Sequence, residues 1–224
     1  MTVVLLARHG RTTANTAGVL AGRAPGTELD DTGKAQAEQL ARRLNGLRLT
    51  AILTSPLQRC LQTLEPVQRD RPRTPVELDE RLAEVDYGDW TGKKLSVLSR
   101  RKLWPVVQNH PSAAVFPRGE GLAQMQARAV EAIREIVRER PKGVVLACSH
   151  GDVIKAIVAD ALGLHLDQFQ RIVVDPGSVS VIAYTEMRPL VLRLNDTTAS
   201  LSGFGRDSRR RTPEVGGGAG PNQP

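Results

Sequence analysis

The chain has 224 residues, of which 40% are apolar, 25% charged and only 3% aromatic, and its formal net charge is +7. This length and apolar content predict one α/β domain with a sizeable core. There is no apolar run of 18 residues and no charged leader followed by an apolar stretch, so we expect a soluble, cytoplasmic protein with no membrane partner. Two cysteines, Cys60 and Cys148, are too few for a disulfide framework.

The positive charge is spread along the chain rather than gathered in one patch. The few aromatic residues do not interleave with the basic ones, as stacking platforms for nucleic acid would. A general excess of basic residues favours the attraction of small anionic substrates. We therefore expect a small anionic molecule as the partner, and no nucleic acid.

The N-terminal segment is the first predicted element. Residues 2–7 form a short, mostly apolar and β-branched run, which predicts a strand buried on both faces. Arg8 and His9 follow directly, and Gly10 lets the chain turn sharply. In open α/β sheets, reactive groups lie at such carboxyl ends of strands.

Strand and helix signals alternate along the rest of the chain. We expect a three-layer α/β/α sandwich around a mostly parallel sheet, in which a C-terminal hairpin makes one strand antiparallel to the rest. The predicted strands are 2–7, 51–54, 76–78, 144–149, 179–184 and 190–194; the predicted helices are about 31–45, 57–68, 93–103, 122 to just before Pro141, and 151–162.

Three later segments supply polar groups that complement Arg8 and His9. One repeats the order of apolar strand, turn and basic residue, one places carboxylates beside a Gly-aromatic loop, and one delivers a second histidine before a helix N-terminus, which favours an anion. These segments are 51–59, ending in Arg59; 81–90, containing Glu84, Asp86 and Asp89; and 144–152, containing His150 and Gly151.

Together and in this order, the motifs resemble those of the histidine phosphatase superfamily, which includes the phosphoglycerate mutases. The resemblance covers about residues 1–194 and implies the phosphoglycerate mutase-like fold. It implies a small phosphorylated metabolite as the substrate, with His9 accepting the phosphoryl group and Glu84 donating a proton. It also implies a phosphate pocket formed by Arg8, Arg59 and His150. Asn15 is implied as one further phosphate contact.

The residue types suit this chemistry on physical grounds. Arginine offers forked donors that match phosphate oxygens and stays charged at any working pH. A neutral imidazole is a competent nucleophile near neutrality. The hypothesis is a two-step hydrolysis: His9 takes the phosphoryl group while Glu84 protonates the leaving oxygen, and Glu84 then deprotonates the attacking water.

Alternatives exist for the acid and for a metal. Asp86 and Asp89 compete with Glu84 for the proton-donor role, and the resemblance favours Glu84. His9, His150, Glu84 and Asp152 could in principle hold a cation, but flanking arginines oppose one. There is no HExxH motif, P-loop or GxGxxG signature. We expect no metal and no cofactor.

Two other functions stay open beside a phosphatase. A cofactor-dependent phosphomutase shares the core residues. The resemblance implies that such a mutase has a longer segment in place of residues 92–119, and the shorter segment of this chain favours an open, hydrolytic site. The basic residues 100–102 could grip a second phosphate and keep the mutase possible. A non-catalytic phosphate-binding module is a third candidate, and it would not need His9 and Glu84.

Departures from the family pattern and the C-terminal composition give the last expectations. Arg11 stands where the family often has Glu or Gln, and we expect it at the mouth of the site, binding a second anionic group of the substrate. Residues 1–196 are predicted to form the catalytic domain, and 197–224, rich in Gly, Pro, Ser and Arg, a flexible tail. A homodimer is common in the family.

Overall fold

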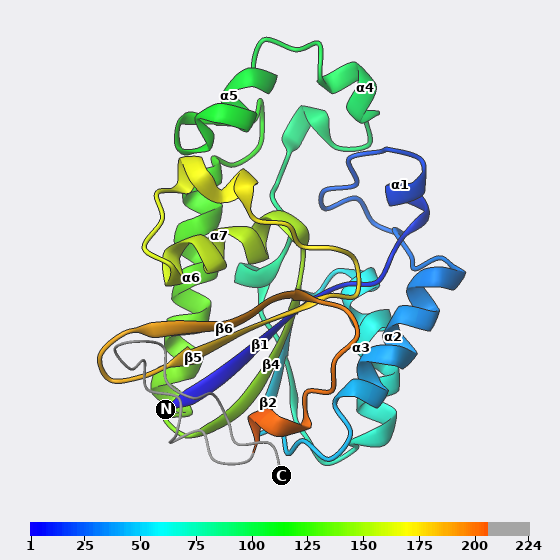
Figure 1. The fold of residues 1–224 in the computed structure, drawn as a ribbon. Coiled ribbons are helices and arrows are strands. Elements are labelled where there is room, and N and C mark those ends of the chain that lie inside the picture. Colours follow the sequence, from blue (N-terminus) through cyan, green and yellow to red (C-terminus); the bar gives the residue numbers. More distant parts are fainter. Residues whose placement is uncertain (206–224) are drawn as a thin grey trace.

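A six-stranded sheet runs through the centre of the molecule in the computed structural model, which describes residues 1–205 (Figure 1). The strand order is β3-β2-β4-β1-β5-β6. β5 is antiparallel to both of its neighbours, whereas the other paired strands are parallel, which confirms the predicted mostly parallel sheet. The strands are β1 (Thr2–Arg8), β2 (Ala51–Thr54), β3 (Val76–Leu78), β4 (Gly143–Ser149), β5 (Val179–Tyr184) and β6 (Pro189–Asp196).

Helices cover both faces of the sheet, so the α/β/α layering is also as predicted (Figure 1). α2 and α3 pack on one face, and α6 and α7 on the other. α4 and α5 lie at the top of Figure 1, away from the sheet. The helices are α1 (Thr13–Thr16), α2 (Asp31–Arg43), α3 (Gln58–Asp70), α4 (Leu95–Leu98), α5 (Trp104–Asn109), α6 (Leu122–Glu139) and α7 (Gly151–Ala161).

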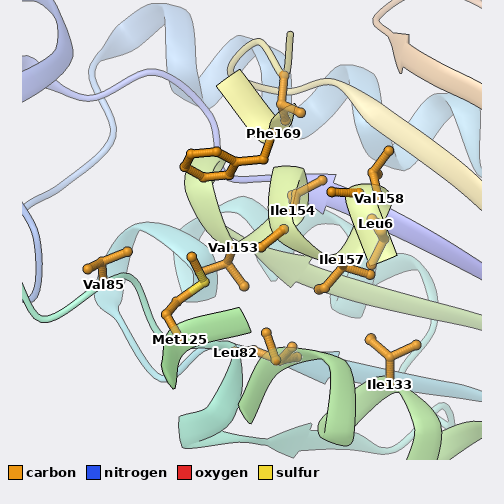
Figure 2. Close-up of a cluster of buried hydrophobic side chains, with 14 of the residues drawn as sticks. Leu6, Leu82, Val85, Met125, Ile133, Val153, Ile154, Ile157, Val158 and Phe169 are labelled. Carbon is orange, nitrogen blue, oxygen red and sulfur yellow. The ribbon is translucent and has the colours of Figure 1, made fainter. Parts of the chain in front are cut away.

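Alternation along the strands divides the core between these two layers. In β1, Val3 and Leu5 face the layer of α2 and α3, whereas Val4 and Leu6 face the layer of α6 and α7. Figure 2 shows the second layer, where Leu6 lies among side chains of α6 and α7 such as Ile133. All these strand residues are at most 2% exposed, so β1 is anchored on both faces and holds the turn at its carboxyl end in a fixed position.

The turn after β1 requires glycine because of close packing. A Cβ at Gly10 would lie 2.5 Å from the carbonyl oxygen of Gly33, near the start of α2. A Cβ at Gly33 would in turn lie against the main chain of Arg11. The backbone just after His9 is therefore in direct contact with the backbone at the start of α2, and this contact holds His9 in place.

The segment above the site differs from the predicted helix 93–103. It forms two short helices, α4 and α5, joined by a turn. Pro105 lies in the first turn of α5, where its missing N–H has no helical partner to lose, so it starts a helix instead of breaking one.

The predicted boundary at residue 197 places the start of the tail too early in the chain. Leu201 is fully buried and Phe204 is 4% exposed, and both belong to the buried apolar cluster formed with α2 and α3. The amide of Leu201 donates to the carbonyl of Arg43, and the Arg43 guanidinium donates to the carbonyl of Ala199. Two apolar residues and these hydrogen bonds tie 197–205 to the domain. Residues 206–224 lie outside the described residues.

Candidate active site

The polar residues of the motifs meet at the carboxyl ends of three adjacent parallel strands. β1, β4 and β2 are neighbours in the sheet, and they lead into His9, His150 and Ser55. The amide of His9 donates to the carbonyl of Ser149, and the ring centroids of His9 and His150 are 5.1 Å apart. Sheet pairing thus places the two predicted histidines side by side.

His9 is held in one orientation by hydrogen bonds at both ring nitrogens. Nδ1 lies 2.7 Å from the carbonyl oxygen of Gly10, which can only accept, so Nδ1 carries the proton. Nε2 then accepts from Nε of Arg59 at 3.2 Å. Burial, followed by the charges of Arg59 and Arg8, lowers the pKa of His9 well below its usual value. The imidazole is therefore neutral, with its Nε2 lone pair directed towards an arginine.

Arg59 connects the two histidines to a loop. It lies in the first turn of α3 and is only 2% exposed. Its Nη2 is 2.8 Å from the carbonyl oxygen of Gly22 and 3.0 Å from Nδ1 of His150. A buried guanidinium shared among these groups fixes the geometry of the strand ends.

His150 lies behind His9, and its side chain does not line the cavity that His9 faces. Nδ1 accepts from Arg59, so Nε2 carries the proton and donates to Oγ of Ser55 at 2.8 Å. Burial, then Arg59 and His9, lower the pKa of His150 well below its usual value. Both nitrogens of this predicted pocket residue are engaged within the protein.

Arg8 presents a buried donor without a partner among the described residues. Its Nη1 donates to the carbonyl of Val174 at 2.6 Å, whereas Nε is buried and has no hydrogen-bond partner. A Cβ at Gly151, the first residue of α7, would lie 3.4 Å from Cζ of Arg8. The guanidinium therefore lies against a helix N-terminus, and both features favour an anion.

Glu84 follows the one-turn 3-10 helix Glu80–Leu82 and lines the same cavity. Burial, and then the charge of Asp152, raise the pKa of Glu84 to about 7. Tyr87 donates its hydroxyl proton to Oδ2 of Asp152 at 2.9 Å, and Nζ of Lys155 lies 3.4 Å from Oδ1 of the same carboxylate. A carboxyl with this pKa can hold a proton near neutrality and also release it.

The competing carboxylates are engaged elsewhere. Oδ1 of Asp86 accepts from the amide of Gly88 at 3.0 Å, and Asp89 is paired with the exposed Arg118. Neither Asp86 nor Asp89 lines the cavity. Of the three candidates, only Glu84 reaches it.

These groups surround a cavity of about 360 Å³, a volume suited to a small molecule. Its lining combines the arginines, His9 and Glu84 with further polar and apolar side chains. The residues that line it are Arg8, His9, Thr12, Asn15, Val19, Leu20, Ala21, Gly22, Arg59, Glu84, Tyr87, Leu95, Gly151, Asp152, Lys155, Gln170, Ile172, Val173 and Val174.

Asn15 and Arg11, the other predicted binding residues, have different positions. Asn15 lines the cavity, and its side-chain oxygen accepts from the amide and hydroxyl of Thr12, which leaves the side-chain NH2 group as a donor. Arg11 does not line it: Nε donates to Oδ2 of Asp30 at 2.7 Å and Nη2 to Oγ1 of Thr32 at 2.7 Å. The structure therefore does not bring Arg11 to the mouth of the site.

Sequence reasoning considered Asp152 only as a ligand of the rejected metal site, and it did not assign Tyr87, Lys155 and Gln170 to the site. Asp152 lies two residues after His150, in the first turn of α7, so its position in the motif could have indicated it. Tyr87 carries no such signal, because its role depends on a hydroxyl contact with a residue 65 positions away.

Residues 1–205 hold neither a cluster of metal ligands nor a membrane-spanning helix. No three side chains of His, Cys, Asp or Glu come together there as a group that could hold a metal ion. Within the same range, no helix has both the length and the apolar character needed to span a bilayer.

Comparison with known proteins agrees with the geometry. Residues 4–197 match the model of the histidine phosphatase superfamily (branch 1). The chain belongs to this superfamily and is an enzyme of the histidine phosphatase family, and its relatives include phosphatases and probable phosphoglycerate mutases.

Three relatives illustrate the range. Phosphoserine phosphatase 1 of Hydrogenobacter thermophilus is 28% identical over 88% of this chain and 93% of its own. The probable phosphoglycerate mutase GpmB of Cronobacter sakazakii is 31% identical over 83% and 86%. The solved structure of Bacillus stearothermophilus YhfR superimposes with a TM-score of 0.83 at 30% identity, covering 88% of this chain and 98% of that one.

Proposed function

We propose that the protein is a metal-independent phosphatase that hydrolyses small phosphate monoesters through a phosphohistidine on His9, with Glu84 as general acid and then general base. The observation that carries the proposal is that one cavity is lined by an unprotonated ring nitrogen of His9 and by a carboxyl group, Glu84, that can hold a proton. His9 is neutral and offers Nε2, whereas the raised pKa of Glu84 lets it keep a proton near neutrality.

In the first step, the phosphate dianion enters between Arg8 and Arg59, whose guanidinium groups neutralise its charge. The lone pair on Nε2 of His9 attacks phosphorus, and the bond from phosphorus to the ester oxygen breaks. Glu84 gives its proton to that oxygen, and the alcohol leaves. The Nδ1–H donated to the Gly10 carbonyl supports the positive charge that develops on the ring.

In the second step, the Glu84 carboxylate removes a proton from a water molecule whose oxygen attacks the phosphohistidine. The bond from nitrogen to phosphorus breaks, its electrons return to Nε2, and inorganic phosphate leaves. Glu84 is protonated again, so one carboxyl group completes the cycle with no net change.

The cavity favours hydrolysis over a mutase reaction. A mutase must retain a bisphosphorylated intermediate, which requires cations for a second phosphate. Among the described lining residues, Lys155 is the cation beyond the Arg8 and Arg59 pair, and it is bound to Asp152. The exposed basic residues 100–102 do not line the cavity.

Phosphate release from a panel of monoesters tests the proposal. The panel contains alkyl and sugar phosphates, phosphoserine and phosphoglycerates, each assayed with EDTA for the unaltered protein and for His9→Ala. We expect release that survives EDTA and is lost in His9→Ala. Loss of release in EDTA would contradict the metal-independent mechanism; tight phosphate binding with no turnover of any ester would favour the non-catalytic binding module.

A further inference from the structure

The segment that carries Glu84 has no regular secondary structure of its own. Residues 84–87 belong to neither a helix nor a strand. A general acid must be held within hydrogen-bond reach of the leaving oxygen, and small displacements are costly. Backbone hydrogen bonds of a helix or strand do not provide that rigidity here, so contacts with other parts of the chain must, such as the bond from the amide of Glu120 to the carbonyl of Asp86.

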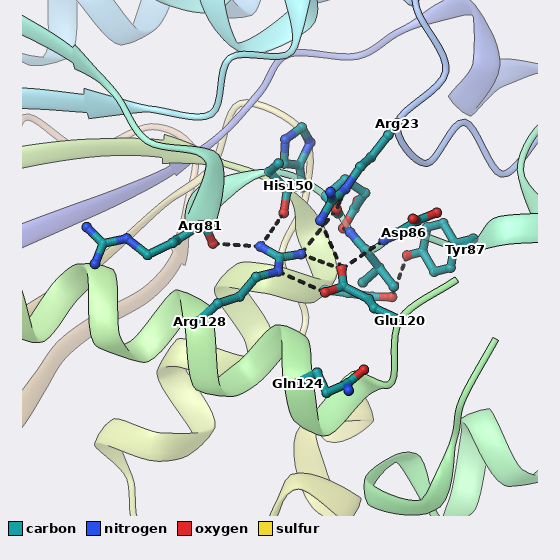
Figure 3. A network of polar contacts seen from close by, with 12 residues as sticks. Arg23, Arg81, Asp86, Tyr87, Glu120, Gln124, Arg128 and His150 are labelled. Atoms are coloured by element: carbon teal, nitrogen blue, oxygen red, sulfur yellow. Dashed lines mark hydrogen bonds and ion pairs between the residues drawn. The ribbon is translucent and has the colours of Figure 1, made fainter. Parts of the chain in front are cut away.

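Arg128, from the middle of α6, supplies three hydrogen bonds at and before Glu84. Its Nη1 donates to the carbonyl oxygens of Arg81 at 2.6 Å and Ala83 at 2.8 Å, and its Nη2 donates to that of Glu84 at 3.2 Å. Figure 3 shows this guanidinium between Arg81 and Glu120. One side chain therefore fixes three carbonyl groups at and before Glu84.

Glu120 links Arg128 to the other side of the segment. Its two oxygens accept from Nε and Nη2 of Arg128 at 2.9 and 2.6 Å, and Oε1 also accepts from the amide of Asp86 at 2.8 Å. Although burial opposes ionisation, the hydrogen bonds of Arg128 and Asp86 and the charge of Arg23 lower the pKa of Glu120. The carboxylate is thus charged throughout the working range.

Arg23 joins this cluster from the loop between α1 and α2. Its Nε donates to the Glu84 carbonyl at 2.8 Å, and its Nη2 lies 3.1 Å from Oε1 of Glu120 (Figure 3). The preceding residue, Gly22, accepts from Arg59, which in turn contacts His9. Two consecutive residues therefore connect the Glu84 segment to the nucleophile.

We infer that Arg23, Glu120 and Arg128 form a positioning clamp that holds Glu84 at the correct distance from His9 for protonation of the leaving group. This inference rests on the proposed function, because it assumes that Glu84 is the general acid. None of the three lines the cavity, so they act through the backbone of residues 81–86.

The test compares two esters whose leaving groups differ in how strongly they need a proton from the general acid. An alkyl phosphate has a poor leaving group and depends on the acid, whereas 4-nitrophenyl phosphate releases a stable phenolate without one. kcat/KM, which reports the step that phosphorylates His9, is measured for both esters in each variant. Glu84→Gln should lose about 10²–10⁴-fold with the alkyl ester and far less with the aryl ester.

Arg23→Met is the principal clamp variant, because the Arg23 side chain is 37% exposed and its loss should leave the fold intact. Glu120→Gln is the second, since the amide still accepts from the Asp86 amide while the charge is removed. We expect each to lose about tenfold in kcat/KM with the alkyl ester and less than about twofold with the aryl ester. Arg134→Met removes an exposed arginine of α6 paired with Asp160 and serves as the matched control.

The outcomes separate the clamp from the proposed function. If Glu84→Gln is selective for the alkyl ester but Arg23→Met and Glu120→Gln lower both esters equally or neither, the clamp is overturned and the function stands. If Glu84→Gln itself shows no selectivity, the role of Glu84 fails and the clamp fails with it. Selective losses in all three variants, with unchanged melting temperature in Arg23→Met and unchanged kinetics in Arg134→Met, support the clamp.

Discussion

Nε of Arg59 donates a hydrogen bond to Nε2 of His9 at 3.2 Å, so the proposed nucleophilic atom is bound to a residue of the proposed phosphate pocket. An arriving phosphate oxygen is a stronger acceptor than a neutral imidazole and can take over this donor. Transfer of the hydrogen bond would free the Nε2 lone pair as the phosphorus atom arrives. Substrate binding and activation of the nucleophile are therefore coupled through one arginine.

Removal of the Arg8 fork should weaken phosphate binding. Arg8→Met eliminates the unpaired Nε donor and one charge, and hydrogen bonds to charged groups contribute about 1.5–3 kcal/mol each. We expect the inhibition constant of inorganic phosphate to rise about 10–100-fold, measured by competition at constant pH. Arg134→Met should leave it unchanged. An unchanged constant in Arg8→Met would place the phosphate elsewhere.

The pH profile should report Glu84 and its neighbour. Glu84 must be protonated to act as the acid, so kcat/KM for an alkyl ester should fall as the pH rises through about 7. The charge of Asp152 raises this pKa, so Asp152→Asn, which can still accept from Tyr87, should move the fall to lower pH. The profiles of both proteins are compared in one buffer series. A shift to higher pH would refute the assigned electrostatics.

Arg11→Ala should not distinguish substrates by charge. The Arg11 guanidinium is bound to Asp30 and Thr32 outside the cavity, so it is not available to a second anionic group. The ratio of kcat/KM for phosphoserine to kcat/KM for a phosphate ester whose alkyl group carries no charge should stay constant within about twofold. The free energy of unfolding should change by about 1 kcal/mol or less. A selective loss with phosphoserine would restore the role that the sequence suggested.

The end of the described chain should contribute to stability. Leu201 is fully buried against the α2 layer, and truncation of such a leucine to alanine costs about 2–5 kcal/mol. Leu201→Ala should therefore lower the free energy of unfolding in urea by that amount and leave kcat/KM nearly unchanged. Leu194→Ala, at an exposed leucine of β6, provides a comparison with little expected cost. Equal stability of both variants would argue for a mobile segment.

The fold and the central pair of histidines could be predicted because they depend on local patterns. Apolar runs mark β1 and β4, and the carboxyl ends of parallel strands share one edge of a sheet. The pattern therefore predicts that His9 and His150 lie at the same edge of the sheet, and the pairing of β1 with β4 makes them neighbours. The proximity of Glu84 came from the family resemblance, since nothing local distinguishes it from Asp86.

Side-chain direction and distant partners could not be predicted. Arg11 stands two residues after His9, but its orientation depends on Asp30, 19 positions later. Leu201 and Phe204 stand within a polar stretch, and their burial depends on a surface formed by α2. The hydrogen bonds of Arg23 to Glu84 and to Glu120 join positions 61 and 97 residues apart, which no short motif records.

The most direct test of the central claim is detection of the phosphoenzyme. The protein is mixed with an excess of a phosphate monoester in EDTA, quenched in alkali to preserve phosphohistidine, and digested for mass spectrometry, with His9→Ala treated in parallel. The phosphohistidine mechanism predicts a phosphoryl group on His9 that forms and decays within one turnover, and none in His9→Ala. Continued turnover without phosphorylation of His9, or with the phosphoryl group on another residue, would contradict it.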